Sequence, residues 1–509
     1  MGNAAREGTP VPEGSTAEVR VREGRLLGRA ERGVFAFKGI PYAAPPFGAR
    51  RMRPPAPAPA WDGVREAFAY GPTVPKGPYP PPYDALLPEP DIPGEDCLNC
   101  NVWTPDPAAA GLPVLVWIHG GAFANGSGAV PTYAGHRFAE DGVVCVTINY
   151  RLGADGFLYA GDEIANVGLA DQLAALRWVA DNIAAFGGDP AKVTIAGESA
   201  GGMSVATLLA SPLSAGLFRG AIPQSGAGHH VLSPETALRV AGRLAERLGV
   251  APTRAAMAAV PLPALLDAQQ ALAAEAAATP DPGRWGEIAT NQMIWEPVVA
   301  APIVPEVPHR AVAQGAGREI ALLVGTNTDE QRLFLVPNGL VDLVDETLLG
   351  LLASAYGLDE AGLARYRENR PGATPGELVV AFGTDWFFRI PAIRLAEARS
   401  GGPAGTWMYE FAWPSPAFGG RLGACHALEL PFVFDTLETE RDELLGAERP
   451  EVLARLVHDA WVRFVSDLDP GWAPYDLDTR AVMTFGPDME AHEVTDPRGD
   501  ERACWEGRR

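Results

Sequence analysis

The sequence predicts an α/β domain in which a large, mostly parallel central sheet is flanked by helices. Two continuous apolar runs, LPVLVWIHGG at residues 112–121 and GVVCVTINYRLG at 142–153, are typical of strands buried on both faces. Residues 168–188 then place apolar side chains at helical spacing and end in two glycines. This alternation of buried strands and helices indicates an α/β architecture.

The alternation continues toward the C-terminus with a strand at 191–199, a helix at 200–211, and strands at 218–226 and 319–330. Two Ala- and Leu-rich segments, around residues 234–285 and 338–400, are predicted to be helical insertions. No internal repeat or linker divides the chain, so we expect one domain over residues 18–509.

The N-terminal part has a different pattern. Residues 18–40 alternate apolar and polar side chains between glycines and predict short strands. Residues 41–95 are rich in proline, which excludes helix and central strand and predicts long surface loops. Residues 1–17 are expected to be a flexible tail. Their first fifteen residues lack the apolar core of a secretory signal, so we expect a cytoplasmic protein unless the chain is a mature exported form.

The composition excludes several classes of partner. The formal net charge of −22 argues against nucleic acid and anionic membrane surfaces, because no basic stripe is present to neutralise phosphates. No apolar run is long enough to span a bilayer. We therefore expect a small-molecule substrate. The sequence leaves the oligomeric state open, and a monomer is the expectation.

Five cysteines in 509 residues suit a reducing compartment better than a disulfide scaffold. Cys97 and Cys100 form a single C-x-x-C with no second pair and no nearby histidine to complete a tetrahedral zinc site. We interpret them as packed thiols and expect no metal.

The segment TIAGESAGG places Ser199 between Gly197 and Gly201 at the junction of a predicted strand and helix. G-x-S-x-G in this context is the nucleophile elbow, a sharp turn that lifts the serine hydroxyl above the end of the sheet. The glycines are needed because a Cβ at either position would collide with neighbouring strands. Ser199 is therefore the candidate nucleophile.

A serine nucleophile needs a base, an acid that orients the base, and donors for the oxyanion. Among the histidines, His426 lies between a glycine-marked turn and an apolar stretch in GACHALELPFVF, whereas His458 falls in a helical pattern and is interpreted as a helix-face residue. The acid candidates follow a predicted strand in TNTDEQ, where Asp329 and Glu330 are equally possible from the residues alone.

With these motifs the sequence resembles the type-B carboxylesterase/lipase family, which is the cholinesterase-like branch of the α/β-hydrolases. The resemblance covers residues 18–490. FGGDPAKVTIAGESAGG matches the serine signature of that family throughout. EDCLNCNVWTP matches a second signature except at Asn99 and Cys100. FKGIPYAAPPFGARR, NYRLGADGFL and NVGLADQLAALRWVADNIAAFGGDP are further segments of the same kind. The resemblance implies an α/β-hydrolase fold, carboxylesterase activity and no cofactor.

Carried over residue by residue, the resemblance implies a triad of Ser199, Glu330 and His426, and so prefers Glu330 over Asp329. Gln331 replaces the glycine that usually follows the acid. HGGAF resembles the oxyanion loop, which implies that the amides of Gly121, Ala122 and Ala200 hold the oxyanion. Two further residues, Glu198 and Ser225, are implied as supporting residues around the triad.

The resemblance also bears on substrate and on disulfides. It implies that Leu333, Phe334 and Trp295 line the substrate pocket, while Arg332 points either to solvent or into the pocket.

In eukaryotic relatives the cysteine of the E-D-C-L motif is bridged to an upstream cysteine. Cys97 has no cysteine before it, so this chain cannot form that bridge.

We therefore expect a serine carboxylesterase that hydrolyses short- to medium-chain neutral esters through an acyl-enzyme on Ser199. One alternative is a biosynthetic thioesterase or acyltransferase that uses the same triad. Another is a non-catalytic interaction domain of the cholinesterase-like type, which the occupied triad positions disfavour.

Overall fold

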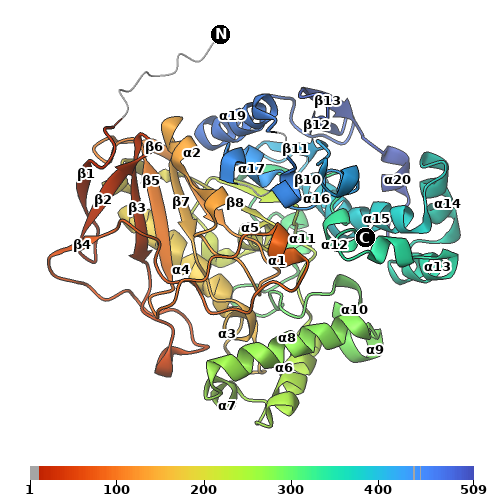
Figure 1. Ribbon diagram of the computed structural model, residues 1–509, viewed down its shortest axis with the longest axis horizontal. Helices are drawn as coiled ribbons and strands as arrows, with labels where there is room; N and C mark the ends of the chain where they lie inside the picture. Colours follow the sequence, from red (N-terminus) through yellow and green to blue (C-terminus); the bar gives the residue numbers. More distant parts are fainter. Residues whose placement is uncertain (1–10, 440–441, 448) are drawn as a thin grey trace.

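The computed structural model describes residues 11–439, 442–447 and 449–509 (Figure 1). Within these residues a 13-stranded sheet runs in the order β1-β2-β3-β5-β7-β6-β8-β9-β10-β11-β12-β13, with β4 paired to β2. The strands are β1 (Thr16–Arg20), β2 (Arg25–Glu31), β3 (Val34–Pro41), β4 (Val64–Glu66), β5 (Asn99–Thr104), β6 (Leu112–Ile118), β7 (Val144–Ile148), β8 (Gly188–Glu198), β9 (Gly220–Gln224), β10 (Ala321–Asn327), β11 (Thr406–Phe411), β12 (Ala481–Phe485) and β13 (Ala491–Thr495).

The central strands pair in parallel, in the order β7-β6-β8-β9-β10-β11-β12. Antiparallel pairs extend this core at both ends, as β1-β2-β3-β5-β7 on one side and β12-β13 on the other. The predicted large, mostly parallel sheet flanked by helices is therefore confirmed. Because parallel strands end at the same edge, the loops that follow β6, β8 and β10 meet there, and these loops carry the candidate site.

The strand β6 shows why the sheet is buried on both faces. Val114, Val116 and Ile118 pack into one apolar core, whereas Leu115 and Trp117 pack into the core on the opposite face. Successive side chains of a strand point to opposite faces, so a strand that faces two cores must be apolar at every position. This is the physical origin of the continuous apolar runs in the sequence.

Helices cover both faces of the sheet (Figure 1). Leu169, Leu173 and Leu176 of α4 and Val205 and Leu208 of α5 enter the first core. The long helix α19 enters the second core through apolar side chains one and two turns apart, namely Leu453, Val457, Trp461 and Phe464. His458 lies on α19, as predicted, and its Nδ1 donates to the carbonyl of Val433.

The helices are α1 (Tyr83–Leu86), α2 (His136–Glu140), α3 (Gly153–Phe157), α4 (Val167–Asn182), α5 (Ala200–Ala210), α6 (Pro234–Leu248), α7 (Arg254–Ala258), α8 (Leu262–Ala278), α9 (Pro282–Trp285), α10 (Ile288–Asn291), α11 (Pro308–Ala313), α12 (Arg332–Leu335), α13 (Glu346–Ala355), α14 (Glu360–Asn369), α15 (Pro375–Thr384), α16 (Ile390–Glu397), α17 (Leu430–Val433), α18 (Asp442–Leu445), α19 (Glu451–Asp467) and α20 (Gly499–Ala503). One turn of π-helix (Asp385–Arg389) joins α15 to α16. Both segments predicted as helical insertions are helical. In Figure 1 helices α6 to α10 project from one side of the sheet.

Two expectations for the N-terminal part need correction. Residues 1–10 of the predicted tail lie outside the described residues, but β1 begins at Thr16, and Gly14 N–H already donates to the carbonyl of Ala30. The proline-rich segment is mostly loop, yet it contains the strand β4 and one helical turn, α1, whose Leu86 is buried. Short turns of this kind survive because proline is tolerated next to a helix start.

A buried ion pair joins the loop after β7 to α4. The guanidinium of Arg151 donates to both carboxylate oxygens of Asp171, at 2.7 and 2.6 Å, and the two side chains are 2% and 0% exposed. The backbone N–H of Arg151 donates to the same carboxylate at 3.0 Å. Asp171 thus fixes both the side chain and the backbone of this loop.

We predict that Asp171→Asn lowers the free energy of unfolding by about 3–5 kcal/mol, because it leaves the guanidinium buried without its counter-charge. Urea denaturation measures the change. Glu235→Gln on α6 is a matched control, since Glu235 pairs with Arg239 at the surface, and it should cost less than about 1 kcal/mol. Equal effects of the two substitutions would contradict the prediction.

Candidate active site

The candidate nucleophile sits at a strained turn between a strand and a helix. β8 ends at Glu198 and α5 begins at Ala200, so Ser199 alone makes the turn, with φ 57° and ψ −124°. A Cβ on Gly197 would lie 2.5 Å from the carbonyl oxygen of Ile118 in β6, and one on Gly201 would lie 2.0 Å from the same atom. The turn therefore requires glycine on both sides of the serine, as the sequence predicted.

The loops after β10 and β11 bring an acid and a histidine to this turn. His426 Nδ1 lies 2.6 Å from Glu330 Oε2, and the other oxygen of Glu330 accepts the backbone N–H of Asn327 at 2.8 Å. Both side chains are buried, at 6% and 0% exposure. Since a carboxylate only accepts, Nδ1 carries a proton, so Nε2 is the nitrogen that acts as a base once it is deprotonated.

Asp329, the other acid that the sequence offered, faces away from His426. Its carboxylate pairs with Arg332 Nε at 2.9 Å and accepts the N–H of Ala424 at 3.2 Å. Arg332 also donates to the carbonyl of Arg421. This geometry favours Glu330 as the partner of the histidine. Arg332 does not line the cavity into which Ser199 and His426 open.

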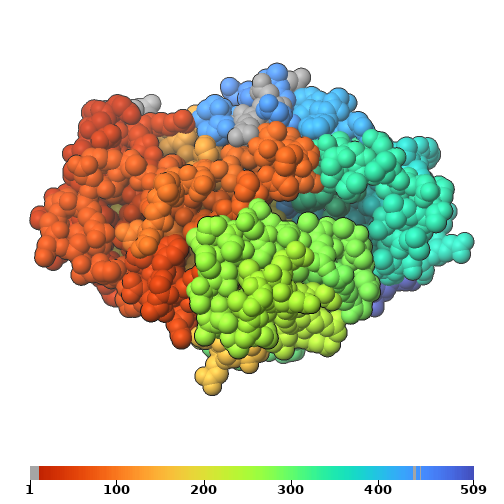
Figure 2. Space-filling model, turned by 60° about the horizontal axis from the view of Figure 1, so that its bottom comes forward, coloured from red at the N-terminus to blue at the C-terminus, as the bar shows by residue number. Residues whose placement is uncertain are grey.

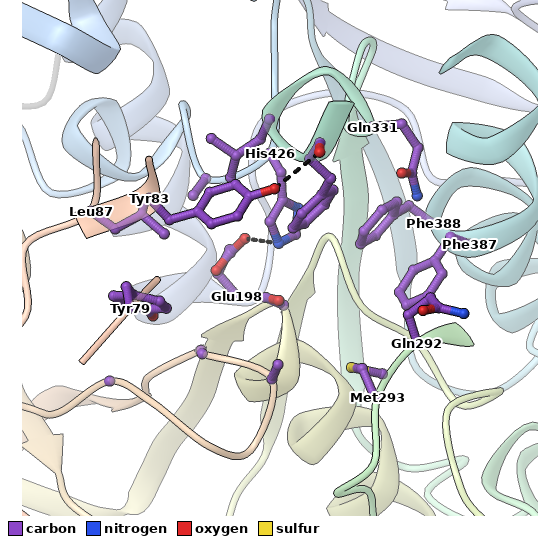
Figure 3. A pocket seen from close by; sticks show the side chains of 18 of the residues that line it. Tyr79, Tyr83, Leu87, Glu198, Gln292, Met293, Gln331, Phe387, Phe388 and His426 are labelled. Carbon is purple, nitrogen blue, oxygen red and sulfur yellow. Dashed lines mark hydrogen bonds and ion pairs between the residues drawn. The ribbon is translucent and has the colours of Figure 1, made fainter. Parts of the chain in front are cut away.

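A second carboxylate contacts the histidine. Glu198 Oε1 lies 3.0 Å from His426 Nε2, and Figure 3 shows Glu198 reaching His426 from within the pocket. No hydrogen bond between Ser199 and His426 occurs among the described residues. Burial alone lowers the pKa of His426, but the charges of Glu198 and Glu330 outweigh it and raise that pKa well above its usual value.

The structure adds a third buried acid that sequence reasoning missed. Glu429, three residues after His426, accepts Gln224 Nε2 at 3.1 Å and Asn327 Nδ2 at 2.7 Å. Burial raises the pKa of Glu429 to about 8, and the charges of Glu198 and Glu330 add to this. The sequence signal was the place of Glu429 three residues after the histidine in GACHALELPFVF, a segment from which only the histidine was given a role.

The predicted oxyanion loop lines the same cavity. Gly121, Ala122 and Phe123 follow β6 with φ values of 110°, 51° and 57°. No hydrogen bond between described residues uses the backbone N–H of Gly121 or Ala122. Ala200 is the first residue of α5, where an N–H has no partner within the helix. The three amides are therefore free to bind an oxyanion, and the start of the helix adds a favourable dipole.

Ser225, predicted as a supporting residue, lies at the end of β9. It is fully buried at a φ of 45°, and its N–H donates to the carbonyl of Gly325. Its hydroxyl has no partner among the described residues. The structure thus shows a backbone contact for Ser225 but no direct contact with the triad.

Ser199 and His426 open into a cavity of about 570 Å³. Figure 2 shows the hollow where the proline-rich segment, the α8–α10 region and the helices after residue 330 meet. Its aromatic lining is Tyr79, Tyr83, Tyr133, Phe334, Tyr356, Phe387 and Phe388, and its charged or titratable lining residues are Glu198 and His426. The size is within the range of small-molecule sites, about 300–1,000 Å³.

The predicted pocket residues fall into two groups. Leu333 and Phe334 line the cavity, and the ring of Phe334 lies 5.2 Å from that of His426. Trp295 does not line it: the side chain is 3% exposed and packs in the core, and Met293 lines the wall instead. That part of the prediction was wrong because an irregular segment gives no pattern that tells which of its side chains turn inward.

The π-helical turn at Asp385–Arg389 supplies a wall that the sequence did not predict. Its insertion lets two consecutive aromatics, Phe387 and Phe388, line the cavity, and Phe388 lies 4.8 Å from the ring of His426. Asp385 and Arg389 pair with each other on the other side of the turn. π-Helical turns are frequent at functional sites because they reorient side chains in this way.

The described residues hold no cluster of three His, Cys, Asp or Glu side chains placed to bind a metal ion. All five cysteines are free, and Cys97 and Cys100 are both buried. The interpretation of this C-x-x-C as packed thiols is therefore confirmed. Among the described helices, none is long and apolar enough to cross a bilayer.

A sequence profile described as the carboxylesterase family matches residues 15–496. The chain belongs to the carboxylesterase family. It is 38% identical over 504 residues to the para-nitrobenzyl esterase of Bacillus subtilis, covering 95% of this chain and 97% of that one. It is also 36% identical to the phenmedipham hydrolase of Pseudarthrobacter oxydans, covering 91% of this chain and 94% of that enzyme.

The solved carboxylesterase EST55 of Geobacillus stearothermophilus at pH 6.2 superposes with a TM-score of 0.83 at 38% identity, covering 96% of this chain and 99% of that one. This carboxylesterase is therefore a carboxylic ester hydrolase of the bacterial type with an α/β-hydrolase fold. The resemblance inferred from the sequence motifs is confirmed, and the reading as a non-catalytic interaction domain is set aside.

We predict that Glu198→Gln moves the acid limb of the kcat/KM profile to lower pH. A histidine base works as neutral imidazole, so activity rises as pH passes its pKa. Removing the charge of Glu198 destabilises the imidazolium and lowers the pKa of His426. Asp329→Asn is the matched control, because Asp329 does not contact His426, and it should leave the limb in place. An acid limb that stays or rises in Glu198→Gln would refute this role.

Proposed function

We propose that this carboxylesterase hydrolyses short- to medium-chain neutral esters through an acyl-enzyme on Ser199. The observation that carries the proposal is the meeting, in one cavity, of a strained serine, the 2.6 Å His426–Glu330 contact and three free backbone amides. We further propose a cytoplasmic monomer; the five free cysteines are what a reducing compartment favours.

In the proposed mechanism His426 Nε2 removes the proton of Ser199 as Oγ attacks the ester carbonyl. For this the imidazole exchanges its contact with Glu198 for one with Ser199, as apo sites commonly tighten on binding substrate. The amides of Gly121, Ala122 and Ala200 stabilise the oxyanion, and the alcohol leaves with the proton from His426. Water then attacks the acyl-enzyme by the same route and releases the acid.

The cavity supports a neutral substrate. Its lining includes no Lys or Arg among the described residues, so a carboxylate on the substrate would find no counter-charge there. The carboxylate of Glu198 is already paired with His426. Apolar and aromatic side chains make up most of the remaining wall, which favours uncharged acyl and alcohol groups.

We predict that Ser199→Ala, His426→Ala and Glu330→Gln each lower kcat by about 10⁴-fold or more while the protein stays folded. The three side chains act as a unit, so the Ser199→Ala/His426→Ala double variant should be little worse than the worse single one. Assays with para-nitrobenzyl butyrate, an ester of the kind for which the Bacillus subtilis relative is named, measure this. Circular dichroism checks the fold.

A fluorophosphonate probe should label Ser199 alone, which mass spectrometry of the modified peptide tests directly. Near-full activity in Glu330→Gln together with loss in Asp329→Asn would overturn the acid assignment.

Paired oxygen esters and thioesters of the same acyl group test the alternative function: a biosynthetic thioesterase would show a higher kcat/KM for the thioester.

We predict no preference for choline esters. Quaternary ammonium groups are bound best over tryptophan, and residues 71–95, the segment over the cavity, contain Tyr79 and Tyr83 but no Trp. Kinetics with butyrylcholine and its uncharged carbon isostere measure the difference. A kcat/KM more than about tenfold higher for the cation, or about 1.4 kcal/mol, would contradict the prediction.

A further inference from the structure

The proline-rich strap, residues 71–95, carries a buried ion pair that touches the back of the oxyanion loop. Lys76 Nζ lies 3.3 Å from Glu89 Oε1, and the two side chains are only 2% and 13% exposed. Lys76 also donates to the carbonyl of Pro90 at 3.0 Å. The attraction within a deeply buried ion pair is largely cancelled by the cost of removing both charges from water. The role of this pair is therefore sought in the other groups that it contacts.

The carboxylate of Glu89 holds two groups of the segment that follows the oxyanion loop. Oε1 accepts the backbone N–H of Gly126 at 3.1 Å, and Oε2 accepts Asn125 Nδ2 at 3.3 Å. Asn125 Nδ2 also donates to the carbonyl of Gly77 in the strap at 2.8 Å. One side of the loop is thus bonded to the strap by three hydrogen bonds.

Gly126 transmits this contact to the oxyanion loop. A Cβ on Gly126 would lie 2.3 Å from the carbonyl oxygen of Gly120 and 2.4 Å from His119 Nδ1, so its backbone packs directly against both. Asn125 and Ala124 donate their N–H groups to the carbonyl of Gly121 at 2.8 and 2.9 Å. The carbonyl of Gly121 belongs to the same peptide as the N–H of Ala122, so these bonds fix its direction.

His119, at the start of the loop, also holds it in place. Its Nδ1 donates to the carbonyl of Gly120 at 2.8 Å, and its ring stacks on Tyr150 at 4.5 Å. Burial lowers the pKa of His119 to about 3, and the nearby charge of Lys76 contributes to this. The ring is therefore neutral in the working pH range and keeps one fixed donor.

We propose that Lys76 and Glu89 are positioning residues for the reaction: their ion pair ties the strap to Asn125 and Gly126 and thereby aims the amides of Gly121 and Ala122 at the oxyanion. This proposal rests on the proposed function of those amides. Within the strap the pair joins Lys76 to Glu89, and the carboxylate of Glu89 bonds the strap to the body of the enzyme. The ion pair does not contact the substrate carbonyl; it acts through the loop.

The test measures kcat, KM and the inhibition constant of a trifluoromethyl ketone for Glu89→Gln, Lys76→Met, the double variant and Asn125→Ala. The hemiketal formed by this inhibitor carries an oxyanion, so its affinity reports the amide geometry directly. We expect kcat to fall by about 10- to 100-fold in each single variant of the pair, with KM changed less than about threefold. Inhibitor affinity should fall in parallel with kcat/KM.

The double variant should recover part of the activity, because neither side chain is then left as an unpaired buried charge. Asn125→Ala removes a link to the strap without burying a charge, so it keeps the proposal testable if a single charge variant fails to fold; we expect a loss of about tenfold in kcat. Glu31→Gln is the matched control: Glu31 pairs with Lys38, which is 11% exposed, on β2 and β3 away from the cavity.

The proposal fails if Glu89→Gln and Asn125→Ala keep kcat within about twofold of the wild type. It also fails if kcat falls but inhibitor affinity does not, or if Glu31→Gln causes the same loss. Labelling of Ser199 by a fluorophosphonate separates the two proposals. If the proposed function fails, neither the wild type nor any variant is labelled, whereas if only the positioning role fails the wild type is still labelled at Ser199.

Discussion

The close crossing of β6 and the turn at Ser199 is the constraint on which the candidate site depends. The carbonyl oxygen of Ile118 lies so near Gly197 and Gly201 that neither position can carry a side chain. The chain between them must turn in one residue, and Ser199 adopts a backbone conformation that costs about 1–3 kcal/mol in an ordinary residue. The buried sheet on both faces holds the strand and the helix in place and so offsets that cost.

The same crossing brings the oxyanion loop to the serine. β6 and β8 are parallel neighbours, so His119–Phe123 and Ser199 emerge at the same edge of the sheet. A Cβ on Gly120 would lie 3.1 Å from the Cβ of Ser199, which shows how closely the loop approaches the proposed nucleophile. The loop is supported from behind by His119, Tyr150 and the strap.

The buried charges around His426 are a second constraint on the candidate site. Glu198 and Glu330 contact the imidazole, Glu429 lies beside them, and Gln224 and Asn327 hold the carboxylate of Glu429 in position. Burial raises the pKa of Glu429, and the charges of Glu198 and Glu330 raise it further. The cluster thus favours the imidazolium of the proposed mechanism, and it resists further negative charge in the pocket.

The sequence by itself determined the alternation of strands and helices, the parallel core and the glycine-flanked serine, because each of these follows from local pattern or from sterics within a few residues. It also named His426 from its setting, while the choice of Glu330 over Asp329 came from a family resemblance. Only the tertiary structure decided which side chains share a space. In the structure Trp295 packs in the core, and a π-helical turn places Phe387 and Phe388 in the cavity wall. Glu429 lies beside the proposed triad, and Lys76 pairs with Glu89 within the strap. These contacts join residues distant in the chain or depend on irregular backbone, and neither leaves a periodic signal in the sequence.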